Sequence, residues 1–283
     1  MSLHSTSRTS IFRRGLVVLA TAATLLAGGL VAAPAAQAIP LVDTDQRDGT
    51  VVTTRMQAGG SLIYGNTETN KLYPAVFRYK VDLGWTGGKL RAFDGVVTLQ
   101  RIGAANVRRF PVTVDAHGNT SKTIKLPGTI NPGFYRVGIE FTAAVQRPDG
   151  EVNRHRVNIN NAETVSVRRQ TMIQKSISNP TATDGRPSRI TGKVRALRIG
   201  DDGDLSWATV RSGTVHLSYD PDGPWEDDKK NVYVRELTIG SDGEFTTVVP
   251  AHDRWWKLTY AGSDRFADNY DWLPQGDHSG CGC

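Results

Sequence analysis

Gly95-Val96-Val97-Thr98-Leu99 and Gly213-Thr214-Val215-His216-Leu217 spell one pattern twice, 118 residues apart. Two further pairs of anchors keep the same order at offsets of 113 and 121 residues: Lys80-Val81 with Lys193-Val194, and Phe134-Tyr135-Arg136-Val137 with Trp255-Trp256-Lys257-Leu258. Three anchors in one order at nearly one offset predict a single type of domain used twice.

The residues between the anchors show the pattern of β-strands. Val76–Leu83 alternates, so that its apolar side chains fall on one face, and Ile190–Leu197 and Val232–Ile239 read likewise. The dipeptides Asp149-Gly150 and Asp242-Gly243 are typical of hairpin turns. Long helical periodicity is missing from the chain after residue 38. The sequence therefore predicts an all-β protein in which each repeat is a β-sandwich.

The N-terminus has the features of an export signal. Arg8, Arg13 and Arg14 precede an apolar run over 16–31, and Ala36-Gln37-Ala38 is a small-x-small cleavage pattern. We expect cleavage before Ile39 and a secreted, extracellular product, by a route that the signal leaves open. A membrane anchor is the alternative, which the Gly and Pro residues at the end of the run disfavour.

The repeats suggest boundaries for the whole chain. We expect a signal peptide at 1–38, a first sandwich at 39–168, a second at 169–272, and a flexible tail at 273–283 that contains both cysteines. Within the first sandwich, 158–162 reads as a turn in the last strand pair.

The second repeat resembles the immunoglobulin-like repeats of secreted actinobacterial proteins, over about Thr171–Trp272. The resemblance rests on five features: Gly192 in the first strand, Trp207 ahead of Gly213–Leu217, Trp225 in a loop, Asp242–Phe245, and Trp256–Gly262. It departs by one residue after Gly262, where Ser263 precedes Asp264. The resemblance implies two tandem immunoglobulin-like β-sandwich domains and no particular activity.

The charge is unevenly divided between the repeats. The chain carries a net +6, of which 39–167 contributes +5 and 168–283 contributes −2. Nucleic-acid binding needs a denser basic face than this, so no nucleic-acid partner is expected. No apolar stretch after the signal approaches the roughly 18 residues that cross a bilayer, so no membrane insertion is expected there.

Tandem aromatics are the first candidate for a binding site. Because adjacent side chains in a strand face opposite ways, Trp256 should face the core and Trp255 and Lys257 should face solvent. The first repeat should likewise expose Phe134 and Arg136. We predict ligand binding at these four residues, to an unknown protein, glycan or cell-wall polymer. The alternative is an aromatic covered by its own loop or held in a cation–π pair.

Acidic loops are the second candidate. Clustered carboxylates in loops suit Ca²⁺, so a calcium site is possible if the two loops meet. Its ligands would be Asp201, Asp202, Asp204, Asp220 and Asp222. Solvated turns are the alternative, because the spacing does not match an EF-hand. The loop Asp220–Lys230 could instead serve an inhibitor or effector of a secreted enzyme.

Other chemistry has weaker signals. Cys281 and Cys283 predict a disulfide or a crosslink between chains, with metal binding or free thiols as alternatives. Catalytic motifs are missing, and His117, His155, His216 and His252 are scattered. The leading expectation is a secreted, non-catalytic binding or adhesion-type protein without a cofactor, and a calcium-binding protein is the second.

Overall fold

The computed structural model describes residues 41–182, 185–220 and 231–276, and within these ranges the protein is all-β. The strands up to residue 169 are β1 (Leu41–Arg47), β2 (Thr50–Ala58), β3 (Ser61–Ile63), β4 (Gly65–Asn66), β5 (Lys71–Leu72), β6 (Ala75–Thr86), β7 (Lys89–Arg101), β8 (Val107–Val112), β9 (Asn119–Leu126), β10 (Gly133–Gln146) and β11 (Val152–Arg169). Those after it are β12 (Thr171–Ile177), β13 (Ser188–Ile199), β14 (Leu205–Thr209), β15 (Thr214–Asp220), β16 (Val232–Thr238), β17 (Glu244–Val249), β18 (Arg254–Tyr260) and β19 (Asn269–Gln275).

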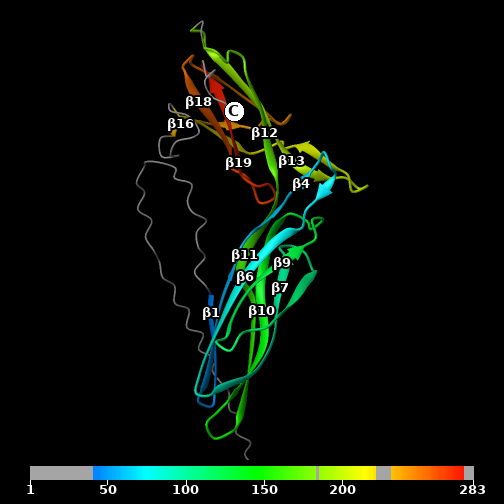
Figure 1. Ribbon diagram of the computed structural model, residues 1–283, viewed down its shortest axis with the longest axis vertical. Coiled ribbons are helices and arrows are strands. Elements are labelled where there is room, and N and C mark those ends of the chain that lie inside the picture. The colour runs from blue at the N-terminus through cyan, green and yellow to red at the C-terminus, as the bar shows by residue number, and fades with distance from the viewer. Residues whose placement is uncertain (1–40, 183–184, 221–230, 277–283) are drawn as a thin grey trace, which may run out of the picture. The chain divides into compact units, whose positions relative to one another are not determined.

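Strands β1–β11 build the first sandwich. One sheet has the order β1-β2-β6-β9, and the other has the order β3-β11-β10-β7-β8. Neighbours pair antiparallel, except that β3 runs parallel to β11. The long strands β11, β10 and β7 carry much of the second sheet (Figure 1). A small hairpin, β4 with β5, stands apart from both sheets.

Strands β12–β19 build the second sandwich. One sheet joins β12, β13 and β14, with β17 also paired to β13, and the other has the order β16-β15-β18-β19. The first half of β13 pairs with β17 and its second half pairs with β14. The first sandwich contains the strand paths β2-β6-β9 and β8-β7-β10-β11, and the second contains β12-β13-β17 and β16-β15-β18-β19. The strands of each pair of sheets follow one another along the chain in the same order, so the two sandwiches have the same topology. Both are immunoglobulin-like sandwiches, as the sequence predicts.

The repeated anchors occupy equivalent strands of the two sandwiches. Gly95–Leu99 lies in β7 and Gly213–Leu217 reaches into β15. Lys80 and Lys193 lie in β6 and β13, and the tandem aromatics lie in β10 and β18. The sequence repeat is therefore a repeat of structure.

Each sandwich closes around apolar side chains from both of its sheets. Phe77 and Val81 from β6 meet Leu99 and Val137 from the facing sheet in the first core. Leu197 and Leu205, which belong to the β13–β14 hairpin, are also buried in this first cluster. The second core is built around Ile190, Val215, Trp256 and other residues of β12–β19.

Two expected boundaries differ from the structure. The flexible tail predicted from 273 is wrong at its start, because β19 continues to Gln275 and buries Leu273 and Gln275. The turn predicted at 158–162 is instead a bulge inside β11, since Val137 pairs with Glu163 while Ile139 pairs with Ile159. In the described ranges, no helix is both long and apolar enough to cross a membrane.

Candidate functional site

The outer face of β16-β15-β18-β19 carries the main candidate surface. The inner face of this sheet is apolar along β18: Trp256 is buried, as predicted, and so are Leu258 and Tyr260. The first sandwich buries the matching row of Tyr135, Val137 and Ile139. Side chains between these positions point outward, as strand alternation requires.

Lys257 lies between two aromatic rings on this outer face. Its Nζ is 4.7 Å from the ring centroid of Tyr270 and 5.0 Å from that of Trp272. The register explains the contact, because Lys257 pairs across the strands with Trp272, and Tyr270 stands one row along β19. Tyr270 is nevertheless 58% exposed. We call Lys257, Tyr270 and Trp272 the aromatic–lysine surface.

A second pair of rings extends the same face. Tyr233 on β16 is 49% exposed, and its ring centroid is 6.2 Å from that of His216 on β15. Glu236 Oε1 lies 3.7 Å from His216 Nδ1. The outer face therefore offers exposed aromatic rings with polar groups close beside them.

The expected exposure of Trp255 is wrong. Its side chain is only 9% exposed, although its neighbours along the outward row include the half-buried Lys257. Trp255 pairs with Asp220 on one side and Pro274 on the other, and Asp220 is itself buried. Alternation predicts the direction of a side chain, but it contains no information about what packs over an outer face.

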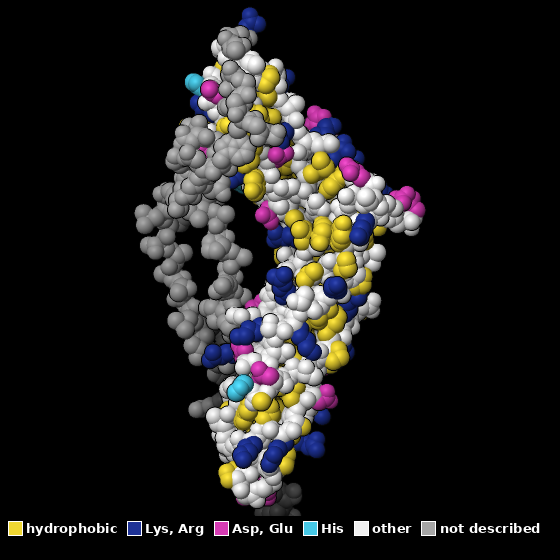
Figure 2. All heavy atoms as spheres, viewed as in Figure 1, with side chains coloured by type: hydrophobic (Ala, Val, Ile, Leu, Met, Phe, Trp, Pro, Cys, Tyr) yellow, Lys and Arg dark blue, Asp and Glu magenta, His cyan; other side chains and the backbone are white. Residues whose placement is uncertain are grey.

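Phe134 and Arg136 lie where the sequence predicts. Phe134 is 44% exposed on β10 and Arg136 is exposed beside it. On the face shown in Figure 2, Lys and Arg side chains recur along the described part of the chain, with hydrophobic side chains between them. The ligand-binding role of Phe134, Arg136, Trp255 and Lys257 remains a prediction.

The described carboxylates of the two acidic loops lie near opposite ends of β13. Asp201, Asp202 and Asp204 follow the C-terminal end of β13. Asp220 lies near the other end: it is opposite Trp255, which is opposite Pro274, and the next residue, Gln275, donates by Nε2 to Ser188 Oγ at the start of β13. The 12 residues of β13 separate these ends by roughly 36 Å at about 3.3 Å per residue. Asp201, Asp202 and Asp204 are therefore far from Asp220. Asp222 and the rest of the second loop, 221–230, lie outside the described residues, so convergence of the loops remains a prediction.

Two carboxylates of the first loop, those of Asp202 and Asp204, have hydrogen-bond partners. Asp202 Oδ1 accepts from the backbone N–H of Asp204, and Asp204 Oδ1 accepts from Asn70 Nδ2 at 2.7 Å. In the described ranges, no group of three or more His, Cys, Asp or Glu side chains is arranged to hold a metal ion. Calcium binding remains a prediction.

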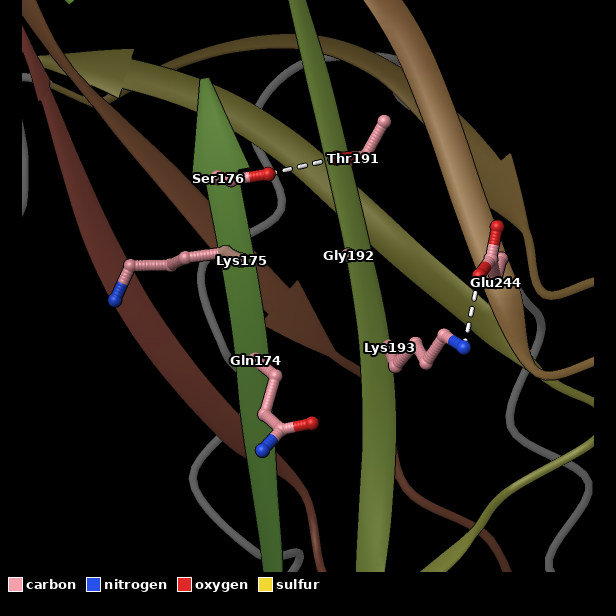
Figure 3. Close-up of a pocket in the computed structure, with 7 residues that line it drawn as sticks. All are labelled: Gln174, Lys175, Ser176, Thr191, Gly192, Lys193 and Glu244. Carbon is pink, nitrogen blue, oxygen red and sulfur yellow. Dashed lines mark hydrogen bonds and ion pairs between the residues drawn. The ribbon is translucent and has the colours of Figure 1, made fainter. Parts of the chain in front are cut away.

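A shallow polar groove of about 340 Å³ lies over β12, β13 and the start of β17 (Figure 3). Ser176 Oγ and Thr191 Oγ1 are hydrogen-bonded at 2.8 Å, and Lys193 Nζ lies 2.8 Å from Glu244 Oε1. Gln174, Lys175 and Gly192 complete the lining. Because four of its polar side chains pair with one another, the groove is a weaker candidate than the aromatic–lysine surface.

Sequence reasoning missed a buried polar network in the first sandwich. His155 is fully buried on β11; its Nδ1 lies 3.1 Å from Asp45 Oδ2 and its Nε2 lies 2.8 Å from Thr50 Oγ1. These residue types also make up hydrolytic triads. Here the hydroxyl of Thr50 is fully buried and donates to Arg47 O at 2.7 Å, so it is not placed to attack a substrate.

Several predicted features lie outside the described residues. These are the signal peptide, most of the Asp220–Lys230 loop with Trp225, and both Cys281 and Cys283. Their predictions stand as the sequence made them.

Comparisons with known proteins add little to this geometry. No family model matches the chain. No curated protein matches its sequence either. Membership of the actinobacterial repeat family therefore remains a resemblance.

Three solved structures share a distant likeness. A tetra-tandem repeat from the extending region of a large adhesion protein matches with 13% identity and a TM-score of 0.24, over 79% of this chain and 55% of that one. A 1.5-MDa bacterial ice-binding adhesin matches with 11% identity and a TM-score of 0.25, over 81% and 74%. The chicken CNTN1 FN1–FN3 domains match with 10% identity and a TM-score of 0.25, over 84% and 99%. The chain thus spans about half the length of the first structure, and these low scores support no inference about function.

Proposed function

We propose that this chain is an extracellular, non-catalytic binding protein of the adhesion type, whose aromatic–lysine surface recognises a glycan. The observation that carries the proposal is the exposed Tyr270 ring held against the Lys257 ammonium. The extracellular location rests on the export signal predicted at residues 1–38.

The chemistry of the surface suits a sugar. The C–H face of a sugar ring packs on aromatic rings, and a nearby ammonium can donate hydrogen bonds to hydroxyl groups. The cation–π contacts of Lys257 with Tyr270 and Trp272 restrict all three side chains before any ligand arrives. A surface that is already ordered loses less side-chain entropy on binding.

The first test is a glycan array and a polysaccharide pulldown with the protein beginning at Ile39. We expect binding that falls at least about tenfold in Tyr270→Ala/Trp272→Ala, because the stacking rings are hot-spot residue types. The matched control is Tyr64→Ala, which removes another exposed tyrosine, from the first sandwich. Equal binding by the double variant and the parent, or no glycan bound at all, would contradict the proposal.

A further inference from the structure

The outer face of β10 and β11, in the first sandwich, carries unpaired cations. Arg136, Arg154 and Arg156 are exposed, and none of them forms an ion pair with a described residue. Arg154 and Arg156 alternate with buried His155 and Val157 on β11, and Arg136 lies between buried neighbours on β10, so all three arginines point outward. Arg156 pairs across the strands with Thr142, six residues along β10 from Arg136. Arg136 and Arg156 are therefore about 20 Å apart along the strands, at about 3.3 Å per residue.

The acidic side chain among the outward residues of these two strands is already neutralised. Glu140 Oε2 accepts a hydrogen bond from Arg109 Nη1 at 2.6 Å, and Glu140 Oε1 accepts one from Arg109 Nη2 at 3.2 Å. Asp94 lies on the neighbouring strand β7, opposite Thr142 of β10, and is not part of β10 or β11. The free charge on β10 and β11 is therefore positive, in the repeat that carries most of the chain's net charge.

A bulge places amide groups between the arginines. Three residues of β11, Asn160–Ala162, oppose the single Gly138 of β10, and Asn158, Asn160 and Asn161 are exposed. A side chain at position 138 would collide with the backbone of Ile159, so the bulge lies directly over this glycine. Bulges of this kind often adjust which side chains a sheet presents. The face offers amides that can donate and accept hydrogen bonds.

Phe134 stands at one end of the same row. It is the residue two before Arg136 on β10, and its ring is half exposed. Cations, amides and one aromatic ring thus follow each other along the outer face of two neighbouring strands. An elongated row of groups suits an extended polymer rather than a small molecule, which needs a concave pocket.

We propose that this face, defined by Phe134, Arg136, Arg154, Arg156 and the bulge at 160–162, binds an anionic polysaccharide. Guanidinium groups form two parallel hydrogen bonds to carboxylate or sulfate groups, and the asparagines bind sugar hydroxyls between them. The site is separate from the aromatic–lysine surface, which lies on the second sandwich. Its failure would therefore leave the proposed function standing.

The test measures binding of the protein beginning at Ile39 to four immobilised polymers: alginate for carboxylate, dextran sulfate for sulfate, neutral dextran, and double-stranded DNA. We expect binding to alginate or dextran sulfate that weakens with added salt, and none to neutral dextran. Arg136→Ala/Arg154→Ala/Arg156→Ala should weaken it at least about tenfold, the loss of three charge-assisted contacts. Far-UV circular dichroism and melting temperature verify that the variant is folded.

The matched control removes the same charge from the opposite sheet. Arg55, Arg78 and Lys125 are exposed on the outer face of β2, β6 and β9, and Arg55→Ala/Arg78→Ala/Lys125→Ala should keep most of the binding. An equal loss in both triple variants would mean that net charge alone attracts the polymer, and would overturn the assignment to this face. DNA bound as tightly as both polysaccharides, or no polyanion bound, would overturn the choice of ligand.

Discussion

A single carboxyl group in the first core illustrates how burial and charge oppose each other. Glu163 pairs with Val137 at the β11 bulge and is almost fully buried. Burial raises the pKa of its carboxyl, and a backbone hydrogen bond from Ala58 opposes part of that rise. The folded protein therefore holds this proton to a higher pH than the unfolded chain does, so wild-type stability falls as pH rises from the unfolded pKa to the folded one.

Glu163→Gln should raise the melting temperature at pH 7, because the amide keeps an oxygen for the Ala58 N–H without a buried charge. The gain should disappear below the ordinary glutamate pKa of about 4.3, where the carboxyl is protonated in both states. Calorimetry from pH 3.5 to pH 7.5 measures the difference between variant and parent. The exposed Glu68→Gln is the control, and a difference that is the same at every pH would contradict the explanation.

At the scale of elements, the strands could be predicted from the sequence, and turn chemistry accounts for one aspartate of the first acidic loop. Asp115, Asp149, Asp202 and Asp242 each accept a backbone N–H two residues ahead with Oδ1. Asp202 therefore satisfies its own hairpin turn, and Asp115 and Asp242 do so at equivalent places in the two sandwiches. In a sequence, aspartates that accept hydrogen bonds within their own turns cannot be told from aspartates that bind a metal ion, until the ends of the strands are placed.

Long-range pairing is what the sequence could not provide. Alternation correctly placed Trp256 in the core and exposed Phe134, but it could not show that Trp255 is buried or that Lys257 contacts rings from β19. The fold class depends on local period and turns, which a sequence displays. The candidate surface depends on the register between β18 and β19, which it does not display.

The β1–β2 hairpin is tied to β11 through the hydroxyl of Thr50. That hydroxyl donates to Arg47 O, its oxygen accepts from Asn153 Nδ2 at 3.0 Å, and it lies 2.8 Å from His155 Nε2. Thr50→Val keeps the shape and removes the hydroxyl that the fully buried His155 ring contacts. It should lower the free energy of unfolding by about 1–3 kcal/mol, measured by urea denaturation.

The effect of this substitution should be localised to one element. Hydrogen exchange should show the amides of β1 and β2 losing protection first, because the tie to β11 has gone. Thr53→Val is the control, since Thr53 lies on the opposite face of β2. A variant as stable as the parent would show that the network does not hold the hairpin.

At the scale of the whole molecule, the two sandwiches share hydrogen bonds across their junction. Asn70, in the loop between β4 and β5, donates to Asp204 Oδ1 and accepts from the N–H of Leu205, both at 2.7 Å. The linking residue Gln170 bonds by its backbone to Ile63 on one side and Leu197 on the other. Leu197 and Leu205 complete the first core from the second sandwich. We expect these contacts to couple the folding of the two halves.

We expect the described part of the chain to unfold in one calorimetric transition, with equal calorimetric and van't Hoff enthalpies. Asn70 has a positive φ of 48°, so Asn70→Gly removes the side chain without straining the backbone. Combined with Leu205→Ala, it should separate the transition into two, because the cavity and the lost hydrogen bonds weaken the shared interface more than either core. Asp48→Gly, at a positive φ of 42° in the β1–β2 turn, is the matched control and should leave one transition. Two transitions in the parent protein would show that the junction does not couple the sandwiches, whatever the double variant does.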